Sequence, residues 1–211
     1  MRILVLSPHA DDAEIGMGGT IAKFAADGNT VKIVCLIVPC ESIDGKLNSE
    51  MKNSRRKEAI RSAELLGAEL EILDIDPYEF SFNREYTKIF DRIIREYRPN
   101  KVFSCWEHDS HQDHKVLANI VTAVTRKNDS SVYMYETMLP GGISSHGFNP
   151  QLYVDISRYS KLKRKTIETY DSVFGGKESD IEAIMSRSRF RGQQIGVQYA
   201  EAFEIVKEIM Y

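Results

Sequence analysis

The chain opens, over residues 1–26, with MRILVLSPHADDAEIGMGGTIAKFAA, in which an apolar strand, a polar cluster and a helical pattern follow one another. The aliphatic run Ile3–Leu6 is typical of a strand that is buried on both faces. Ala13–Ala26 carries its apolar residues at helical spacing. The polar residues Pro8–Asp12 lie between the two, so they are expected at the carboxyl end of the first strand.

The same alternation of strand and helix continues along the chain. Val31–Val38 is a second β-branched run that is apolar on both faces, and Gly67 stands where a helix over Ser49–Leu66 would end. Strands separated by helices are joined by right-handed crossovers, so the pattern predicts a three-layer α/β sandwich. The other expected elements are strands over Glu69–Leu73, Lys101–Cys105, Val132–Thr137 and Leu152–Val154, and helices over Asn83–Tyr97, His111–Thr125 and from Ser157 onward.

Length and composition limit the class of protein. A chain of 211 residues, 42% of them hydrophobic, suits one domain with a sizeable core. The 31 acidic and 28 basic residues give a net charge of −3, which argues against a nucleic-acid or anionic-membrane binder that relies on bulk charge. No run approaches the ~18 apolar residues that would span a membrane, and no signal-peptide pattern is present. We therefore expect a cytoplasmic protein.

The cysteines favour neither a disulfide framework nor a cysteine-based zinc site. Cys35, Cys40 and Cys105 are odd in number and form no CxxC pair.

Two short polar clusters contain most of the residues that carry chemistry. Pro8–Asp12 follows the first expected strand, and Asp109–His114 follows the strand over Lys101–Cys105. In an open parallel sheet, ligand sites form in crevices at the carboxyl ends of strands. Three of the five histidines lie in these two stretches, so we expect the clusters to meet in one site.

The residue types in the two clusters suit metal-assisted hydrolysis of an amide or ester. A carboxylate and two imidazoles can hold Zn²⁺ and leave one position open for water or substrate. His9 and Asp12 are three residues apart, as are His111 and His114, so each pair can face one way. A carboxylate that does not bind the ion could take a proton from the attacking water. The alternative is structural, because Asp11 and Asp12 also suit a helix N-terminus and the histidines a helix surface.

Beyond this chemistry, the sequence resembles the LmbE-like, or PIG-L, family of zinc-dependent N-deacetylases. Residues 8–20, PHADDAEIGMGGT, are similar to its opening signature, and residues 111–114, HQDH, match its second motif, HxDH. Within the family, the sequence resembles the small bacterial enzymes, which include those that act on N-acetylglucosamine conjugates. Three further blocks agree, so that the resemblance runs from about residue 3 to about residue 203: Arg55–Glu58 with Leu66–Gly67, Val154–Ser157 with Tyr170–Ser172, and Gly192–Gly196 with Tyr199–Phe203.

The resemblance implies a fold and an activity. Residues 1–211 would form a single LmbE-like domain, a Rossmann-like three-layer α/β/α sandwich with a mostly parallel sheet. The enzyme would remove the N-acetyl group from an N-acetylglucosamine-type amino sugar or its conjugate and release acetate. Its partner would be that small molecule, without nucleic acid or a membrane span, and a homo-oligomer is compatible with the family.

The resemblance also assigns roles to individual residues. His9, Asp12 and His114 would bind Zn²⁺, with Fe²⁺ as an alternative in the cell because two imidazoles and a carboxylate accept both metals. Asp11 would be the general base. The remaining implied roles are His111 as oxyanion stabiliser or general acid, Asp113 as the residue that orients it, Tyr199 as a phenol at the oxyanion, and Arg55 as a contact to the sugar or its anionic substituent.

Two other functions stay open at this point. The same metal site would serve hydrolysis of a different acyl amide, an ester or a carbamate. A metal-binding protein without turnover is disfavoured, because both Asp11 and His111 are present.

Other features have simpler explanations. The glycines of Gly16–Thr20 are expected to let a helix pack closely on the sheet, since a dinucleotide would meet carboxylates where its pyrophosphate must bind. The charge run Lys161–Lys165 predicts a solvated helix face. Trp106 suits either packing or stacking on a sugar, and His108 suits a supporting or surface position. Leu139–Pro150 is expected to be a loop, and its length suggests a functional one.

Overall fold

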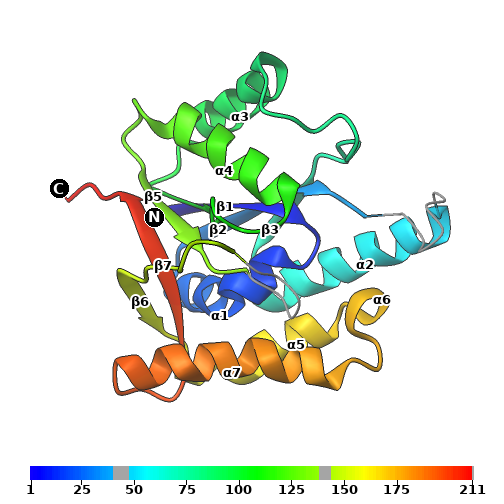
Figure 1. Cartoon of the computed structure of the whole chain (residues 1–211), viewed down its shortest axis with the longest axis vertical. Coiled ribbons are helices and arrows are strands. Elements are labelled where there is room, and N and C mark those ends of the chain that lie inside the picture. Colours follow the sequence, from blue (N-terminus) through cyan, green and yellow to red (C-terminus); the bar gives the residue numbers. More distant parts are fainter. Residues whose placement is uncertain (40–47, 138–143, 211) are drawn as a thin grey trace.

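The computed structural model describes residues 1–39, 48–137 and 144–210, and within them a seven-stranded sheet forms the centre of the molecule (Figure 1). The strand order is β3-β2-β1-β4-β5-β7-β6, and β7 runs antiparallel to both of its neighbours. The sheet is otherwise parallel, which confirms the predicted α/β class. The strands are β1 (Arg2–His9), β2 (Thr30–Ile37), β3 (Glu69–Ile72), β4 (Lys101–Cys105), β5 (Ser131–Tyr135), β6 (Leu152–Asp155) and β7 (Ala200–Lys207).

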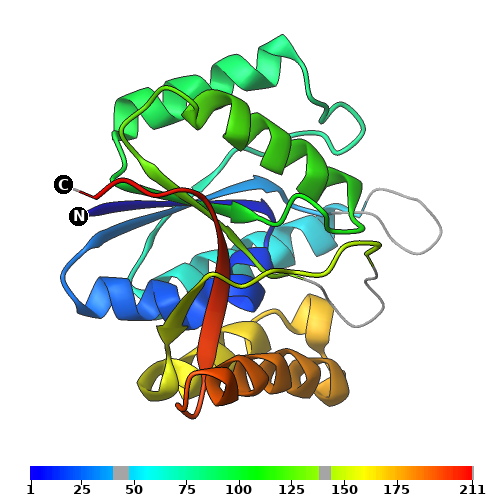
Figure 2. The ribbon, with the colours of Figure 1, turned by 60° about the vertical axis from the view of Figure 1, so that its left-hand side comes forward.

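Helices cover both faces of the sheet. Figures 1 and 2 show α3 (Arg84–Tyr97) and α4 (Gln112–Thr125) on one face, and α1 (Asp12–Ala26) and α2 (Ser49–Leu66) on the other. The later helices pack outside α1 and α2, so this side of the molecule is two helices deep. They are the 3₁₀ turn η1 (Ser157–Tyr159), α5 (Ser160–Glu168), α6 (Asp171–Phe174) and α7 (Glu178–Gln194). No helix of the described ranges is long and apolar enough to cross a bilayer.

Local sequence signals explain where helix α2 begins and ends. The Asn48 side chain accepts hydrogen bonds from the backbone N–H groups of Glu50 and Met51, which satisfies two free donors at the helix start. Gly67 ends the helix with a φ of 70°, a left-handed conformation that glycine adopts at little cost. The predicted end of this helix is thus confirmed.

The C-terminal part of the chain differs from the prediction. Helices were expected from Ser157 onward, but Ala200–Lys207 forms β7. Alanine, glutamate and lysine favour helix locally, whereas the strand is imposed by pairing with β5 and β6, which lie far away in sequence.

The charged residues Lys161–Lys165 of α5 were predicted to form a solvated helix face, and only part of this run does so. Lys161 and Lys165 are exposed as predicted, but the Lys163 side chain is buried. Cys35 and Cys105 are buried free thiols, while Cys40 lies outside the described residues.

Close packing of α1 explains two of its glycines. A Cβ added to Gly16 would lie 2.3 Å from Cδ2 of Tyr135, and one added to Gly19 would lie 2.7 Å from Cδ1 of Ile156. Tyr135 cannot move aside easily, because its ring is fully buried and its hydroxyl donates to the Leu6 carbonyl over 2.8 Å. The expected role of these glycines in packing is confirmed.

We predict that Gly16→Ala lowers the stability of the protein by about 1–3 kcal/mol, the usual cost of overpacking a core. Gly147→Ala is the control, because a Cβ there meets nothing within 4 Å. Thermal unfolding followed by circular dichroism measures both. Equal melting temperatures for the two variants would contradict the packing argument.

Candidate metal centre and active site

The two polar clusters of the sequence meet at the carboxyl ends of β1 and β4. These strands are neighbours and run parallel, and β1 is the strand at which the order along the sheet reverses. His9 is the last residue of β1, and Asp12 begins α1. His114 lies in the first turn of α4. Such a switch point is where parallel sheets form their ligand crevice.

Three side-chain atoms form a compact triangle at this edge of the sheet. Nδ1 of His9 lies 3.1 Å from Oδ2 of Asp12 and 3.4 Å from Nε2 of His114. The remaining edge, from Nε2 of His114 to Oδ2 of Asp12, is 3.2 Å. A tetrahedral zinc ion with bonds of about 2.0–2.1 Å places its ligands roughly 3.4 Å apart. The donor types and their spacing therefore fit such an ion.

In each imidazole of the triangle, the ring nitrogen that faces away from the triangle contacts a carboxylate. Nε2 of His9 lies 3.0 Å from Oδ2 of Asp113. Nδ1 of His114 lies 3.0 Å from Oδ2 of Asp109, which also accepts a 2.6 Å hydrogen bond from the Thr137 hydroxyl. Carboxylates in this position fix which ring nitrogen faces a metal.

The carboxylate of Asp113 does not lie where the sequence analysis expected it. It lies 3.0 Å from the His9 ring but 3.8 Å from Nδ1 of His111, the residue it was expected to orient. The contact with His111 comes from the backbone, since the Asp113 N–H donates to His111 Nδ1 over 3.2 Å. This bond makes His111 the N-cap of α4 and fixes its ring by a different route.

The electrostatics favour positive charge between His9 and His114. Burial opposes the protonated rings, yet the nearby carboxylates outweigh it and raise the pKa of His9 to about 9 and that of His114 to about 10. Burial likewise opposes ionisation of Asp12 and Asp109, but the histidines lower the pKa of Asp12 far below its usual range and that of Asp109 to about 2. A divalent cation would be stabilised by the same carboxylates.

His111 adds a third imidazole to the crevice. Its ring centroid lies 4.6 Å from that of His9 and 4.9 Å from that of His114. Nitrogen atoms of these three rings lie within 4.8 Å of one another, so a three-histidine set is an alternative to the set with Asp12. The triangle with Asp12 is tighter. Burial and the two other histidines lower the pKa of His111, which keeps its ring neutral at pH 7.

Asp11 lies beside the triangle in an unusual backbone conformation. Its φ is 138°, a region that residues other than glycine seldom occupy and that is often found at functional sites. Its carboxylate has no hydrogen-bond partner in the described part of the chain. Burial, and then the charge of Asp12, raise the pKa of the Asp11 carboxyl well above its usual range. A carboxyl with such a pKa is suited to proton transfer near neutral pH.

Arg55 lies near Asp11, whereas the described contacts of Tyr199 are with Ser157 and an apolar cluster. The charge of Arg55 lowers the pKa of Asp11, and its Nε is buried without a partner among the described residues. The Tyr199 backbone N–H donates to the Ser157 hydroxyl, and its ring packs against the apolar cluster beneath β2. No hydrogen bond within residues 1–39, 48–137 and 144–210 joins its hydroxyl to the histidines.

The aromatic residues near the site divide into packed and exposed ones. Trp106 is buried, with Phe148 against its ring at 5.5 Å, so it serves packing and has no face for a sugar. His108, which is half-buried, stacks on the exposed His146 with a ring distance of 4.2 Å. Of the predicted loop Leu139–Pro150, residues 139–143 lie outside the described ranges.

Sequence reasoning missed the roles of Asp109 and Thr137. Asp109 was part of a recognised cluster, but its spacing of five residues from His114 gives no sign of their contact. Thr137 lies 28 residues from Asp109, at the end of β5. Only the pairing of β4 with β5 brings the two together.

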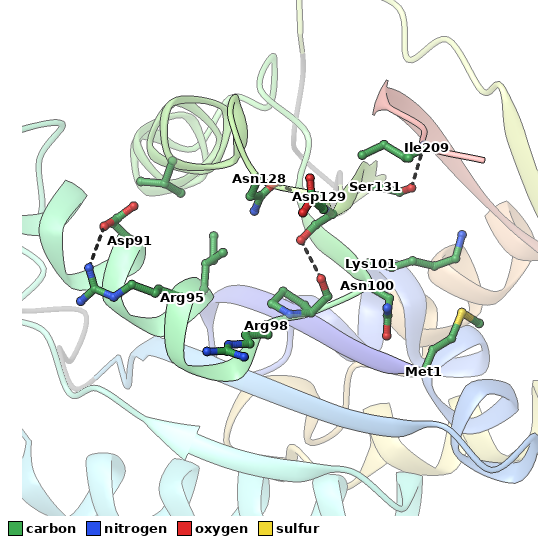
Figure 3. Close-up of a pocket in the computed structure, with 14 residues that line it drawn as sticks. Met1, Asp91, Arg95, Arg98, Asn100, Lys101, Asn128, Asp129, Ser131 and Ile209 are labelled. Carbon is green, nitrogen blue, oxygen red and sulfur yellow. Dashed lines mark hydrogen bonds and ion pairs between the residues drawn. The ribbon is translucent and has the colours of Figure 1, made fainter. Parts of the chain in front are cut away.

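A separate cavity lies at the opposite end of the sheet, where β4 and β5 begin (Figure 3). It has a volume of about 630 Å³ and lies between the ends of α3 and α4, with an Arg95–Asp91 ion pair of 3.7 Å on its wall. Its lining in the described part of the chain includes none of the candidate site residues. It therefore provides positions for control substitutions far from the histidines.

Comparison with known proteins identifies the family. PIG-L, described as GlcNAc-PI de-N-acetylase, matches residues 4–125, which is more than half of the chain. The chain belongs to the PIG-L family. The predicted enzyme class, an N-deacetylase that cleaves a carbon–nitrogen bond, follows from this membership.

The chain is also similar to three known proteins. Diacetylchitobiose deacetylase of Thermococcus kodakarensis is 28% identical over 226 residues, covering 99% of this chain and 84% of the relative. The crystal structure of the conserved protein TT1542 from Thermus thermophilus superposes with a TM-score of 0.81 at 26% identity, over 99% of this chain and 96% of that one. A 4-oxalmesaconate hydratase of Pseudomonas putida is 26% identical over 70% of this chain and 60% of its own length.

We predict that Asp109→Asn weakens metal binding by about 10- to 100-fold, the usual cost of losing a partner behind a metal-binding histidine. The carboxylate accepts from His111 N–H on one oxygen and contacts Thr137 and His114 with the other, and an amide has only one acceptor oxygen. Titration with Co²⁺ measures the affinity. Asp91→Asn, in the separate cavity, is the matched control. Unchanged affinity in Asp109→Asn would contradict this role.

Proposed function

We propose that the protein is a metal-dependent N-deacetylase that removes the acetyl group from an N-acetylglucosamine-type amino sugar or its conjugate. The observation that carries the proposal is the triangle of His9, Asp12 and His114. The buried carboxylate of Asp11, which has no hydrogen-bond partner among the described residues, lies beside it. The proposal treats residues 1–211 as one LmbE-like domain. Membership of the PIG-L family and the likeness to a diacetylchitobiose deacetylase support it.

His9, Asp12 and His114 would hold the ion, for which we propose Zn²⁺. Two imidazoles and a carboxylate are common zinc ligands, and the same set also accepts Fe²⁺. When bound, the ion supplies a Lewis acid that polarises the acetyl carbonyl and lowers the pKa of water. Asp109 and Asp113 would keep the imidazoles oriented toward it.

The chain's own residues would handle the protons and the oxyanion. Asp11 would accept a proton from the attacking water at its carboxylate, since burial raises its pKa toward the working range. The same carboxyl would then pass that proton to the leaving nitrogen. His111, neutral and half-exposed, would donate a hydrogen bond to the developing oxyanion. Tyr199 stays a prediction from the sequence, because its described contacts are with Ser157 and the apolar cluster.

Arg55 is proposed as a substrate contact. Its guanidinium acts on Asp11 from helix α2, and its buried Nε has no partner in the described ranges. A hydroxyl or an anionic group of the substrate would supply that partner. A positive charge here would favour conjugates that carry a carboxylate or phosphate.

A second candidate function is the addition of water to a carbon–carbon double bond. It is suggested by the 26% identical hydratase of Pseudomonas putida. The base and the metal site would serve either reaction. The products distinguish them, because only deacetylation releases acetate and a free amine.

The direct test of the proposal is acetate release from a panel of N-acetylglucosamine derivatives. Metal-loaded protein is expected to release acetate from at least one member, and chelated protein to release none. Adding Zn²⁺ back should restore release, which serves as the control for damage by the chelator. A metal-loaded protein that releases no acetate from any member would contradict the deacetylase and direct attention to the other acyl substrates or to hydration.

We further predict that Asp11→Asn lowers kcat by about 10²- to 10⁴-fold, the usual contribution of a general base, and leaves metal binding within about twofold. Asp27→Asn is the control, since it makes the same change at the exposed end of the same helix. Steady-state acetate release and metal titration measure the two effects. Equal kcat for Asp11→Asn and wild type would remove Asp11 as the base.

A further inference from the structure

Helix α1 is broken in the middle. Met17 has φ −147° and ψ 24°, which are not helical, so α1 consists of one short piece before Met17 and a longer piece after it. In an unbroken helix the Gly19 N–H would donate to the Ile15 carbonyl. At a break, the carbonyl of the first piece and the N–H groups of the second need other partners.

One buried ion pair supplies partners on both sides of the break. Glu201 accepts from the Gly19 N–H over 3.0 Å and from the Thr20 N–H over 2.6 Å, one with each carboxylate oxygen. Lys163 Nζ donates to the Ile15 carbonyl over 2.8 Å and lies 2.5 Å from Glu201. The Lys163–Glu201 pair therefore supplies most of the partners that the break requires, and Arg187 Nη2 of α7 makes a longer bond of 3.2 Å to the same Ile15 carbonyl.

The Lys163–Glu201 ion pair is almost completely buried, which bears on its role. The side chains of Lys163 and Glu201 are only 1% and 2% exposed. Burying two charges is costly, and apolar residues of similar volume often give equal or greater stability. Apolar residues could not bond the Ile15 carbonyl or the two N–H groups. The bonds to α1, rather than stability, thus distinguish this pair from an apolar alternative.

The Ile15 carbonyl, to which Lys163 donates, belongs to the same helical turn as the candidate ligand Asp12. The turn is fixed at its other end by β1, since the Ala13 N–H donates to the Ser7 hydroxyl and the His9 N–H donates to Asp12 Oδ2 over 2.9 Å. The Ile15 N–H in turn donates to the Asp11 carbonyl. The first piece of α1 is thereby held between β1 on one side and α5 with β7 on the other.

We propose that Lys163 and Glu201 are positioning residues for the metal centre. By holding the broken α1, they set the place of Asp12 relative to His9 and His114. The inference rests on the proposed function, because it assumes that Asp12 is a metal ligand.

The test compares Co²⁺ binding to the metal-free protein and its variants, followed by visible absorption. Glu201→Gln is expected to weaken Co²⁺ binding at least tenfold and to change the cobalt spectrum. The amide has only one oxygen to accept the two N–H groups, and it leaves Lys163 without a counter-charge. An affinity and spectrum equal to those of wild type would overturn the inference.

A double variant separates positioning from stability. Lys163→Met with Glu201→Gln removes both charges of the pair, so its melting temperature is expected to recover toward that of wild type. Its Co²⁺ affinity is expected to stay at least tenfold weaker, because the Lys163 bond to the Ile15 carbonyl and at least one of the two bonds to the second piece remain lost, which leaves the longer Arg187 bond to Ile15. Wild-type affinity in the double variant would overturn the proposal, even if Glu201→Gln alone failed to fold.

Phe90→Leu controls for a general loss of stability. Phe90 is a core residue of α3, on the opposite face of the sheet from α1. This variant should melt at a lower temperature and bind Co²⁺ like wild type. If Phe90→Leu lost as much Co²⁺ affinity as Glu201→Gln, the affinity would depend on overall stability. That result would overturn the proposed positioning role of Lys163 and Glu201. Wild-type protein that binds no Co²⁺ would instead refute the proposed function, and the inference with it.

Discussion

The parallel pairing of β1 with β4 is the contact on which the candidate site depends. Val5 of β1 pairs with Phe103 of β4, and both strands then run on to the same edge of the sheet. His9 leaves β1 there, and His114 enters from the helix that follows β4. The two rings come from segments 105 residues apart, yet their nearest nitrogens are 3.4 Å apart.

This arrangement concentrates acidic groups in a buried cluster at one edge of the sheet. Asp11, Asp12, Asp109 and Asp113 all lie within it and are all nearly inaccessible to solvent. Carboxylates at such a depth require compensating positive charge or hydrogen bonds. His9 and His114 supply part of this positive charge as long as they are protonated. A divalent cation would supply the charge without protons. A folded state that depends on this charge is consistent with a site shaped by function rather than by stability.

The parts of the fold that follow from local pattern were predictable from the sequence. Helix α2 and strand β4 have the expected bounds because an N-cap, a C-terminal glycine and a compact apolar run mark them. The two clusters of the site were predictable because a parallel sheet brings the carboxyl ends of its strands together. Their residues do lie in one crevice.

The features that escaped prediction depend on contacts distant in sequence. Strand β7 has helix-forming residues and becomes a strand only by joining β5 and β6. Lys163 looks like one charge in a solvated run until β7 brings Glu201 to it. Asp113 was assigned to His111 by its place in a motif, whereas its carboxylate lies on His9, which is 104 residues away. In each case the sequence showed the residue type but not its partner.

The central claim is that His9, Asp12 and His114 are the metal ligands, and locating the ion tests it most directly. Crystals of the zinc-loaded protein, measured above and below the zinc absorption edge, would show the ion as an anomalous peak. The account predicts one peak in the crevice at about 2.0–2.2 Å from His9 Nδ1, Asp12 Oδ2 and His114 Nε2. A peak bound by His111 in place of Asp12, or no peak in this crevice, would contradict it.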